Sequence, residues 1–92
     1  MSRNKFAYRL RKHRKMMRLS QTEVAEKLKH SNTNLISRWE RGVTLPSLEN
    51  VLKLSVIYKT LVNELFYDYI LEYQKELYPD ERKSIDRKCN SP

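Results

Sequence analysis

Glycine, cysteine and proline are scarce in this chain of 92 residues, which holds one, one and three of them. So few turn-forming residues disfavour an all-β fold and favour helices. The single cysteine, Cys89, cannot form an internal disulfide, which fits a reducing, intracellular setting. Long apolar runs are also missing, because none approaches the roughly 18 residues that span a membrane. The basic N-terminus lacks the apolar stretch of a secretory signal after it.

Negative charge is scarce in the first half of the chain. Residues 1–48 hold twelve Lys and Arg against three acids, a net charge of +9, whereas residues 49–92 hold seven against eight, a net charge of −1. Positive charge gathered in one half of a chain presents a face to a polyanion. Nucleic acid is favoured over an acidic membrane surface as that polyanion, and an anionic protein partner stays open as an alternative.

Apolar residues recur at helical spacing through most of the chain, which predicts an all-α fold. A first helix is expected to end near Arg18, and Ser20 with Glu23 forms a capping box at the start of a short second helix. Thr60 is expected to cap a fifth helix. The residues that mark the fourth helix lie at helical spacing: Leu48, Val51, Leu52, Ser55 and Tyr58.

The stretch HSNTNLISRWERG, residues 30–42, contains the chain's only tryptophan and its only glycine. Asn32 is predicted as the N-cap of a third helix, over about residues 32–41. Ile36 and Trp39 are spaced to face the core together. Gly42 is expected to end the helix, because glycine adopts the left-handed conformation there without steric cost.

Taken together, LRKHRKMMRLSQTEVAEKL and LISRWERGVTLPSLENVLKLSVIYKTLVNELF resemble the XRE/Cro-like helix-turn-helix domain of phage and bacterial repressors. The resemblance runs from about Leu10 to Phe66. It implies a five-helix lambda-repressor-like DNA-binding domain over residues 1–66, with an extended C-terminal helix after it. The matching positions implied to be structural are Arg14, Glu40, Ala25, Ile36, Trp39 and Gly42, with Arg14 and Glu40 paired across the fold.

The chain departs from the family pattern at several turns. Places where the family often has glycine carry Arg18, Lys29 and Lys59 here. If those backbones are left-handed, each costs about 1 kcal/mol relative to glycine. The turn between the second and third helices is also one residue longer than usual, and His13 replaces the usual apolar residue before Arg14.

The resemblance implies that the third helix lies in the DNA major groove. The side chains implied to contact base edges are Thr33, Asn34, Ser37 and Arg38. Arg38 can pair bidentately with guanine and Asn34 with adenine. The residues expected near the phosphate backbone are Gln21, Arg11, Arg41, Thr44 and Lys29. Phosphate contacts position the protein but carry no sequence information.

The chain continues beyond the resemblance as YDYILEYQKELY, so residues 67–78 are predicted to extend the last helix. An apolar stripe on it is a candidate dimerisation surface, consisting of Phe66, Tyr69, Ile70, Tyr73 and Leu77. The stripe either joins a symmetry mate in a homodimer, the favoured alternative, or packs back on its own domain. Residues 79–92 are predicted to form a disordered tail, because seven of the side chains from position 80 on are charged.

These patterns predict a sequence-specific double-stranded DNA-binding transcriptional regulator, bacterial or phage-encoded and cytoplasmic. The alternative is a helix-turn-helix protein-interaction module, such as an antitoxin-like or bridging factor, in which DNA binding is secondary. The residues suggest no catalytic set, so we do not expect an enzyme. No cofactor, small-molecule ligand or membrane partner is expected, and the wide spacing of His13 and His30 argues against a metal site.

Overall fold

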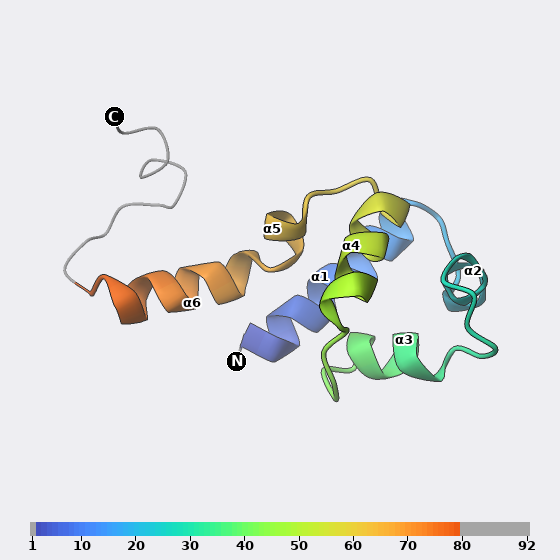
Figure 1. Ribbon diagram of the computed structural model, residues 1–92, viewed down its shortest axis with the longest axis horizontal. Coiled ribbons are helices and arrows are strands. Elements are labelled where there is room, and N and C mark those ends of the chain that lie inside the picture. Colours follow the sequence, from blue (N-terminus) through green and yellow to red (C-terminus); the bar gives the residue numbers. More distant parts are fainter. Residues whose placement is uncertain (1, 80–92) are drawn as a thin grey trace.

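The computed structural model describes residues 2–79 and contains six helices in that part of the chain, with no strand among them (Figure 1). The helices are α1 (Ser2–Met16), α2 (Gln21–Lys27), α3 (Asn34–Glu40), α4 (Leu48–Ile57), α5 (Val62–Leu65) and α6 (Tyr67–Leu77). The predicted all-α fold is therefore confirmed. The expected tail lies outside the described residues from position 80 on, and so does Cys89.

The core gathers one apolar face from each of the first five helices. Its buried side chains are Phe6, Leu10, Val24, Ala25, Leu28, Ile36, Trp39, Leu54, Tyr58 and Leu65. Helix α1 is central to the packing, because both α3 and α6 pack against it. Ala25 and the two apolar residues of α3, Ile36 and Trp39, take the buried positions expected of them.

Two of the helices begin with side-chain caps. The hydroxyl of Ser20 accepts a hydrogen bond from the Glu23 amide at 3.0 Å, and the Glu23 carboxylate accepts one from the Ser20 amide at 2.9 Å. This is the predicted capping box of α2. Ser47 caps α4 in the same way, because its hydroxyl accepts from the Asn50 amide at 3.2 Å. Both helix starts are thus set by local sequence.

The third and fifth helices each begin one or two residues later than predicted. Thr33, not Asn32, occupies the N-cap of α3 but makes no side-chain cap, while the Asn32 carboxamide accepts from the Asn34 amide at 2.9 Å. Leu61, not Thr60, precedes α5. The Thr60 amide is already bonded to the Ser55 carbonyl at the end of α4, so the chain needs one more residue before it can start a new helix.

Four helices end in one recurring motif, which places a left-handed residue just past the helix. These residues are Arg18 (φ 58°), Lys29 (φ 61°), Gly42 (φ 74°) and Lys59 (φ 52°). At each, the next amide donates to a carbonyl five residues back, as Leu19 does to Arg14 and Val43 to Arg38. The three residues that replace the family's glycines are therefore left-handed, which L side chains adopt at a cost of about 1 kcal/mol each.

The predicted single last helix is divided at Phe66 into the short α5 and the longer α6. Helix α6 then packs back on α1: the rings of Phe6 and Phe66 stack with centroids 4.4 Å apart. The Arg9 guanidinium bonds to Asp68 at 2.6 Å and lies over the ring of Tyr67 at 5.1 Å from its centroid. The start of α6 is therefore attached to its own domain.

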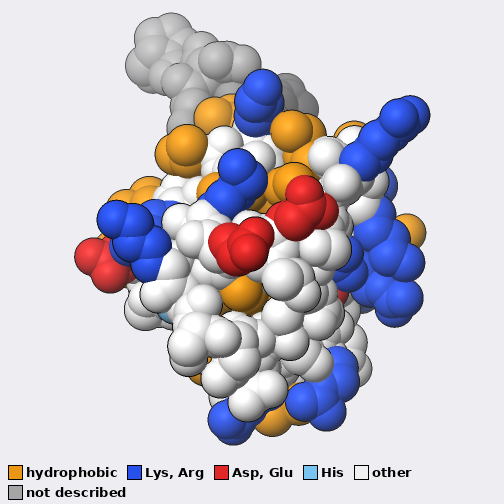
Figure 2. Space-filling view, turned by 90° about the vertical axis from the view of Figure 1, so that its right-hand side faces the viewer, with side chains coloured by type: hydrophobic (Ala, Val, Ile, Leu, Met, Phe, Trp, Pro, Cys, Tyr) orange, Lys and Arg blue, Asp and Glu red, His pale blue; other side chains and the backbone are white. Residues whose placement is uncertain are grey.

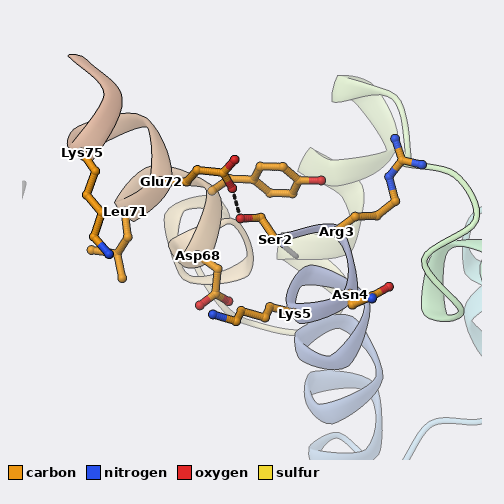
Figure 3. Close-up of a pocket in the computed structure, with 9 residues that line it drawn as sticks. Ser2, Arg3, Asn4, Lys5, Asp68, Leu71, Glu72 and Lys75 are labelled. Carbon is orange, nitrogen blue, oxygen red and sulfur yellow. Dashed lines mark hydrogen bonds between the residues drawn. The ribbon is translucent and has the colours of Figure 1, made fainter. Parts of the chain in front are cut away.

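A groove separates the first turn of α1 from the middle of α6 (Figure 3). Its lining is charged with both signs, with Lys5 and Lys75 as well as Asp68 and Glu72. Lys5 points toward Asp68, and the Ser2 hydroxyl donates to the Glu72 carboxylate across the groove (Figure 3). Beyond this junction α6 extends away from the rest of the molecule (Figure 1). With α6 included, the extents of the molecule are 46 × 25 × 21 Å.

Candidate nucleic-acid interface

Helix α3 presents a polar outer face because its two apolar anchors are fixed on the other side. Ile36 and Trp39 are buried, and the helix packs on both α1 and α2. Among the residues expected to contact base edges, Asn34 and Arg38 are exposed, whereas Thr33 and Ser37 are half-buried. The structure thus gathers the four on one short helix, with Thr33 at its N-cap rather than within it.

Leu35 is an outward residue of α3 that the sequence analysis did not single out. Its side chain is exposed, next to Asn34 and one turn from Arg38. The helical spacing alone already places Leu35 outside, because Ile36 and Trp39 fix the buried side of the helix and leave positions 34, 35 and 38 on the outer side. An exposed leucine there adds an apolar group to an otherwise polar face.

The long turn before α3 is anchored by His30. Its ring meets Trp39 edge to face with centroids 6.3 Å apart, and its Nδ1 is buried with no hydrogen-bond partner among the described residues. Its amide donates to the carbonyl of Ala25 at 2.9 Å and closes the end of α2. The extra turn residue is therefore absorbed between two fixed points, His30 and the Asn32 side chain.

An ion pair joins α1 to the end of α3. Arg14 donates from Nε to Glu40 Oε2 at 2.7 Å and from Nη2 to Glu40 Oε1 at 3.0 Å, and the third nitrogen, Nη1, donates to the carbonyl of Leu19 at 2.9 Å. The two side chains are 11% and 4% exposed. The pairing implied for these residues is therefore present, and it is the two-point kind that fixes orientation as well as distance.

The charges around this ion pair are reflected in the pKa values of its neighbours. The hydrogen bond to Glu40 raises the pKa of the Arg14 guanidinium above its ordinary value, more than burial lowers it. Burial, and then the Glu40 carboxylate, raise the pKa of the Tyr58 phenol well above its ordinary range. Burial, and then Lys12, lower the pKa of His13. The half-buried His13 therefore favours the neutral state in this basic part of α1.

Two of the residues expected near phosphates, Gln21 and Thr44, have side-chain polar groups that are either bonded within the fold or buried. The Gln21 carboxamide donates to Glu40 Oε1 at 3.1 Å, so Gln21 completes the ion pair between α1 and α3 instead of facing solvent. The Thr44 hydroxyl is buried and finds no partner among the described residues. The remaining three residues are exposed: Arg11, Lys29 and Arg41.

Most basic side chains lie toward the rim of the face that carries α2, whereas acidic ones lie near its middle and at one edge (Figure 2). The exposed acids of α2 are Glu23 and Glu26. A polyanion would be repelled from the outer surface of α2 and attracted to its borders, where Lys29 and the end of α3 lie. The charge distribution therefore favours approach along α3 over approach onto α2.

Residues 2–79 contain no cluster of three or more His, Cys, Asp or Glu side chains arranged to hold a metal ion. None of the helices in this range is both long and apolar enough to cross a bilayer. The outer face of α3 and the basic residues around it stay the best candidate for a functional surface.

Comparison with known proteins gives one match. A helix-turn-helix family model matches residues 10–65, which is more than half of the chain and takes in everything from the second half of α1 to the end of α5. Neither the curated proteins nor the solved structures contain a match to the chain. The matched range includes all the residues just described on α2, α3 and their turn.

Proposed function

Because the chain belongs to the XRE-type helix-turn-helix family of DNA-binding proteins, we propose that it is a sequence-specific transcriptional regulator that inserts α3 into the major groove of double-stranded DNA. The observation that carries the proposal is the two-sided character of α3. One side is fixed by the buried Ile36 and Trp39, while the other exposes Asn34, Leu35 and Arg38. A rigidly anchored helix with an exposed hydrogen-bonding face suits base recognition.

The side chains of α3 have complementary chemistry for base edges. Arg38 supplies the fork that matches guanine O6 and N7, and Asn34 supplies the donor and acceptor that match adenine N6 and N7. Leu35 can contact a thymine methyl group, and the hydroxyls of Thr33 and Ser37 can bond to several bases. Each bidentate contact is worth about 1–3 kcal/mol of discrimination against a wrong base.

Affinity would come from phosphate contacts around α3. Lys29 lies in the turn before the helix, and Arg41 directly follows its last residue. Both are exposed, as is Arg11 on α1, and the three supply the positive charge for such contacts. Such contacts release counterions and make binding strongly dependent on salt. The Gln21 carboxamide also donates to Glu40 and so supports the end of α3.

The proposed regulator acts as a homodimer through the exposed end of α6. The predicted dimerisation stripe is divided: Phe66, Tyr69 and Ile70 are half-buried, and Phe66 and Tyr69 both contact the Phe6 ring, whereas Tyr73 and Leu77 are exposed. Packing of α6 on its own domain and dimerisation are thus compatible. A two-fold dimer would bind a palindromic site with half-sites about 34 Å apart, one turn of DNA.

The proposal is tested by selecting a binding site from random duplexes and then titrating the selected and a scrambled duplex at several salt concentrations. We expect the selected duplex to bind at least about 1,000-fold more tightly, with affinity falling steeply as salt rises. Equal affinity for the two duplexes would refute sequence-specific regulation and favour the protein-interaction alternative.

A further inference from the structure

Helix α4 exposes an apolar stripe that the fold of its own chain does not cover. Leu48, Leu52 and Val56 follow one another at four-residue spacing and are 72%, 50% and 76% exposed. The opposite side of α4 is the one that enters the core, through Val51, Leu54 and Tyr58. Because helical residues four apart lie above one another, the three form a continuous ridge about 12 Å long.

The end of α6 exposes a second apolar surface of similar shape. Tyr73 and Leu77 are 52% and 70% exposed and also lie four residues apart. This part of α6 extends away from the body of the molecule (Figure 1), so it does not lie along the α4 stripe of its own chain. Solvent-exposed ridges of this kind on two different helices indicate contact surfaces for another molecule.

The two ridges have complementary borders. Lys53 on α4 and Lys59 just after it are both exposed, and the one acid of that helix, Glu49, pairs with Lys53 at 3.8 Å, so this segment keeps a net positive charge. Glu72, which also accepts from the Ser2 hydroxyl of its own chain, and Glu76 directly precede Tyr73 and Leu77 along α6, and these two acids outnumber the exposed Lys75, so this segment keeps a net negative charge. Opposite charges beside two apolar ridges favour one helix packing against the other and disfavour each packing against its own kind.

We propose that the end of α6 docks on the α4 ridge of a second copy of the chain, and that the second copy returns the same contact. Tyr73 and Leu77 of each copy pack against Leu52 and Val56 of the other. One such contact joins two short helical ridges and is small, whereas stable interfaces bury on the order of 1,200 Å² or more. The two-fold exchange makes the contact twice and closes the dimer without leaving a free ridge.

This inference rests on the proposed homodimer and specifies its contacts, but it does not depend on base recognition by α3. The test uses two full-length variants, one altered on each ridge. The first carries Leu52→Asp with Val56→Asp, and the second carries Tyr73→Asp with Leu77→Asp. All four positions are at least half exposed, so both variants are expected to fold, which circular dichroism checks.

Sedimentation is measured for the wild type, for each variant alone and for an equimolar mixture. We expect the wild type to be dimeric and each variant alone to dissociate at least 100-fold more readily, because both of its contacts are damaged. In the mixture, the intact α6 of the first variant meets the intact α4 of the second, so one complete contact is restored. The mixture should therefore associate at concentrations at which neither variant does.

A matched control is Tyr8→Asp on α1, an equally exposed side chain outside both ridges, which should leave association unchanged. A dimer that survives in the first variant would mean that α6 pairs with α6, and one that survives in the second would mean that α4 pairs with α4. Either of these two results would overturn the exchanged contact. So would a monomeric wild type, or a mixture of the two variants that does not associate. Titration of wild type with its selected duplex, run in parallel, shows separately whether the proposed DNA binding stands.

Discussion

Arg14 and Glu40 lie 26 positions apart in the sequence and meet in a two-point ion pair at 2.7 and 3.0 Å. The pair joins the last turn of α1 to the last residue of α3, and Gln21 and the Leu19 carbonyl occupy further hydrogen-bonding positions around it. The orientation of α3 is therefore fixed by polar contacts at its end as well as by Ile36 and Trp39 along its buried side.

Arg14→Ala is expected to lower the free energy of unfolding by about 3–5 kcal/mol, because it leaves the Glu40 carboxylate buried without its charged partner. Urea denaturation followed by circular dichroism measures the loss. The matched control is Lys53→Ala, which breaks the exposed pair with Glu49 at 3.8 Å and should cost no more than about 0.5 kcal/mol. Similar losses in the two variants would show that the Arg14 pair contributes little.

The turns show how far the sequence alone determines this fold. The capping box of Ser20 and Glu23 and the glycine stop at Gly42 were predictable, because each depends on residues within one turn of each other. The predicted start of α3 was wrong by one residue, since Asn32, a good capping residue by type, uses its carboxamide in a local turn while Thr33 takes the N-cap position. The turn before it is held by a tertiary contact, His30 against Trp39, which the local sequence does not show.

Lys59→Gly is expected to stabilise the protein by about 0.5–1 kcal/mol, because glycine adopts the left-handed backbone at this position without the steric cost of a side chain. Thermal unfolding should shift upward by a few degrees. Gly42→Ala is the matched change in the other direction: its new Cβ would lie 2.8 Å from Asn4 Oδ1, and the backbone there is also left-handed. A destabilised Lys59→Gly variant would argue that the lysine side chain makes a compensating contact.

The parts of the candidate site that depend on tertiary packing were the ones that sequence patterns described least well. Gln21 was placed at the phosphates by family position, but its carboxamide bonds to Glu40, which comes close only once α2 and α3 are packed. The stripe on α6 was a single feature in the sequence, yet α1 half-covers its first three residues and leaves Tyr73 and Leu77 exposed. Periodicity identifies an apolar face, but not what covers it.

Alkaline pH is expected to destabilise the folded state through Tyr58. Burial raises the pKa of its phenol above the ordinary value of 10.0, so the folded chain favours the neutral form. The resulting stability is fully present below about pH 10 and is lost as the pH rises above that value. Urea denaturation at several pH values should show a steeper alkaline loss for the wild type than for Tyr58→Phe. The exposed Tyr8→Phe, outside both ridges, is the control and should follow the wild type.

Arg38→Ala is expected to relax base preference without unfolding the protein. The side chain is exposed on α3 and takes no part in the core, so the free energy of unfolding should change by less than about 0.5 kcal/mol. Loss of a bidentate contact should cost about 1–3 kcal/mol on the selected duplex and much less on duplexes with the guanine position changed. Competition binding against a set of single-base variants of the selected site measures this.

Arg41→Ala is the matched comparison. Because Arg41 is expected to contact a phosphate, its loss should weaken binding to all duplexes alike and reduce the salt dependence of binding. If Arg38→Ala also weakened every duplex equally, Arg38 would be a phosphate contact, and base recognition would have to come from Asn34 and Leu35.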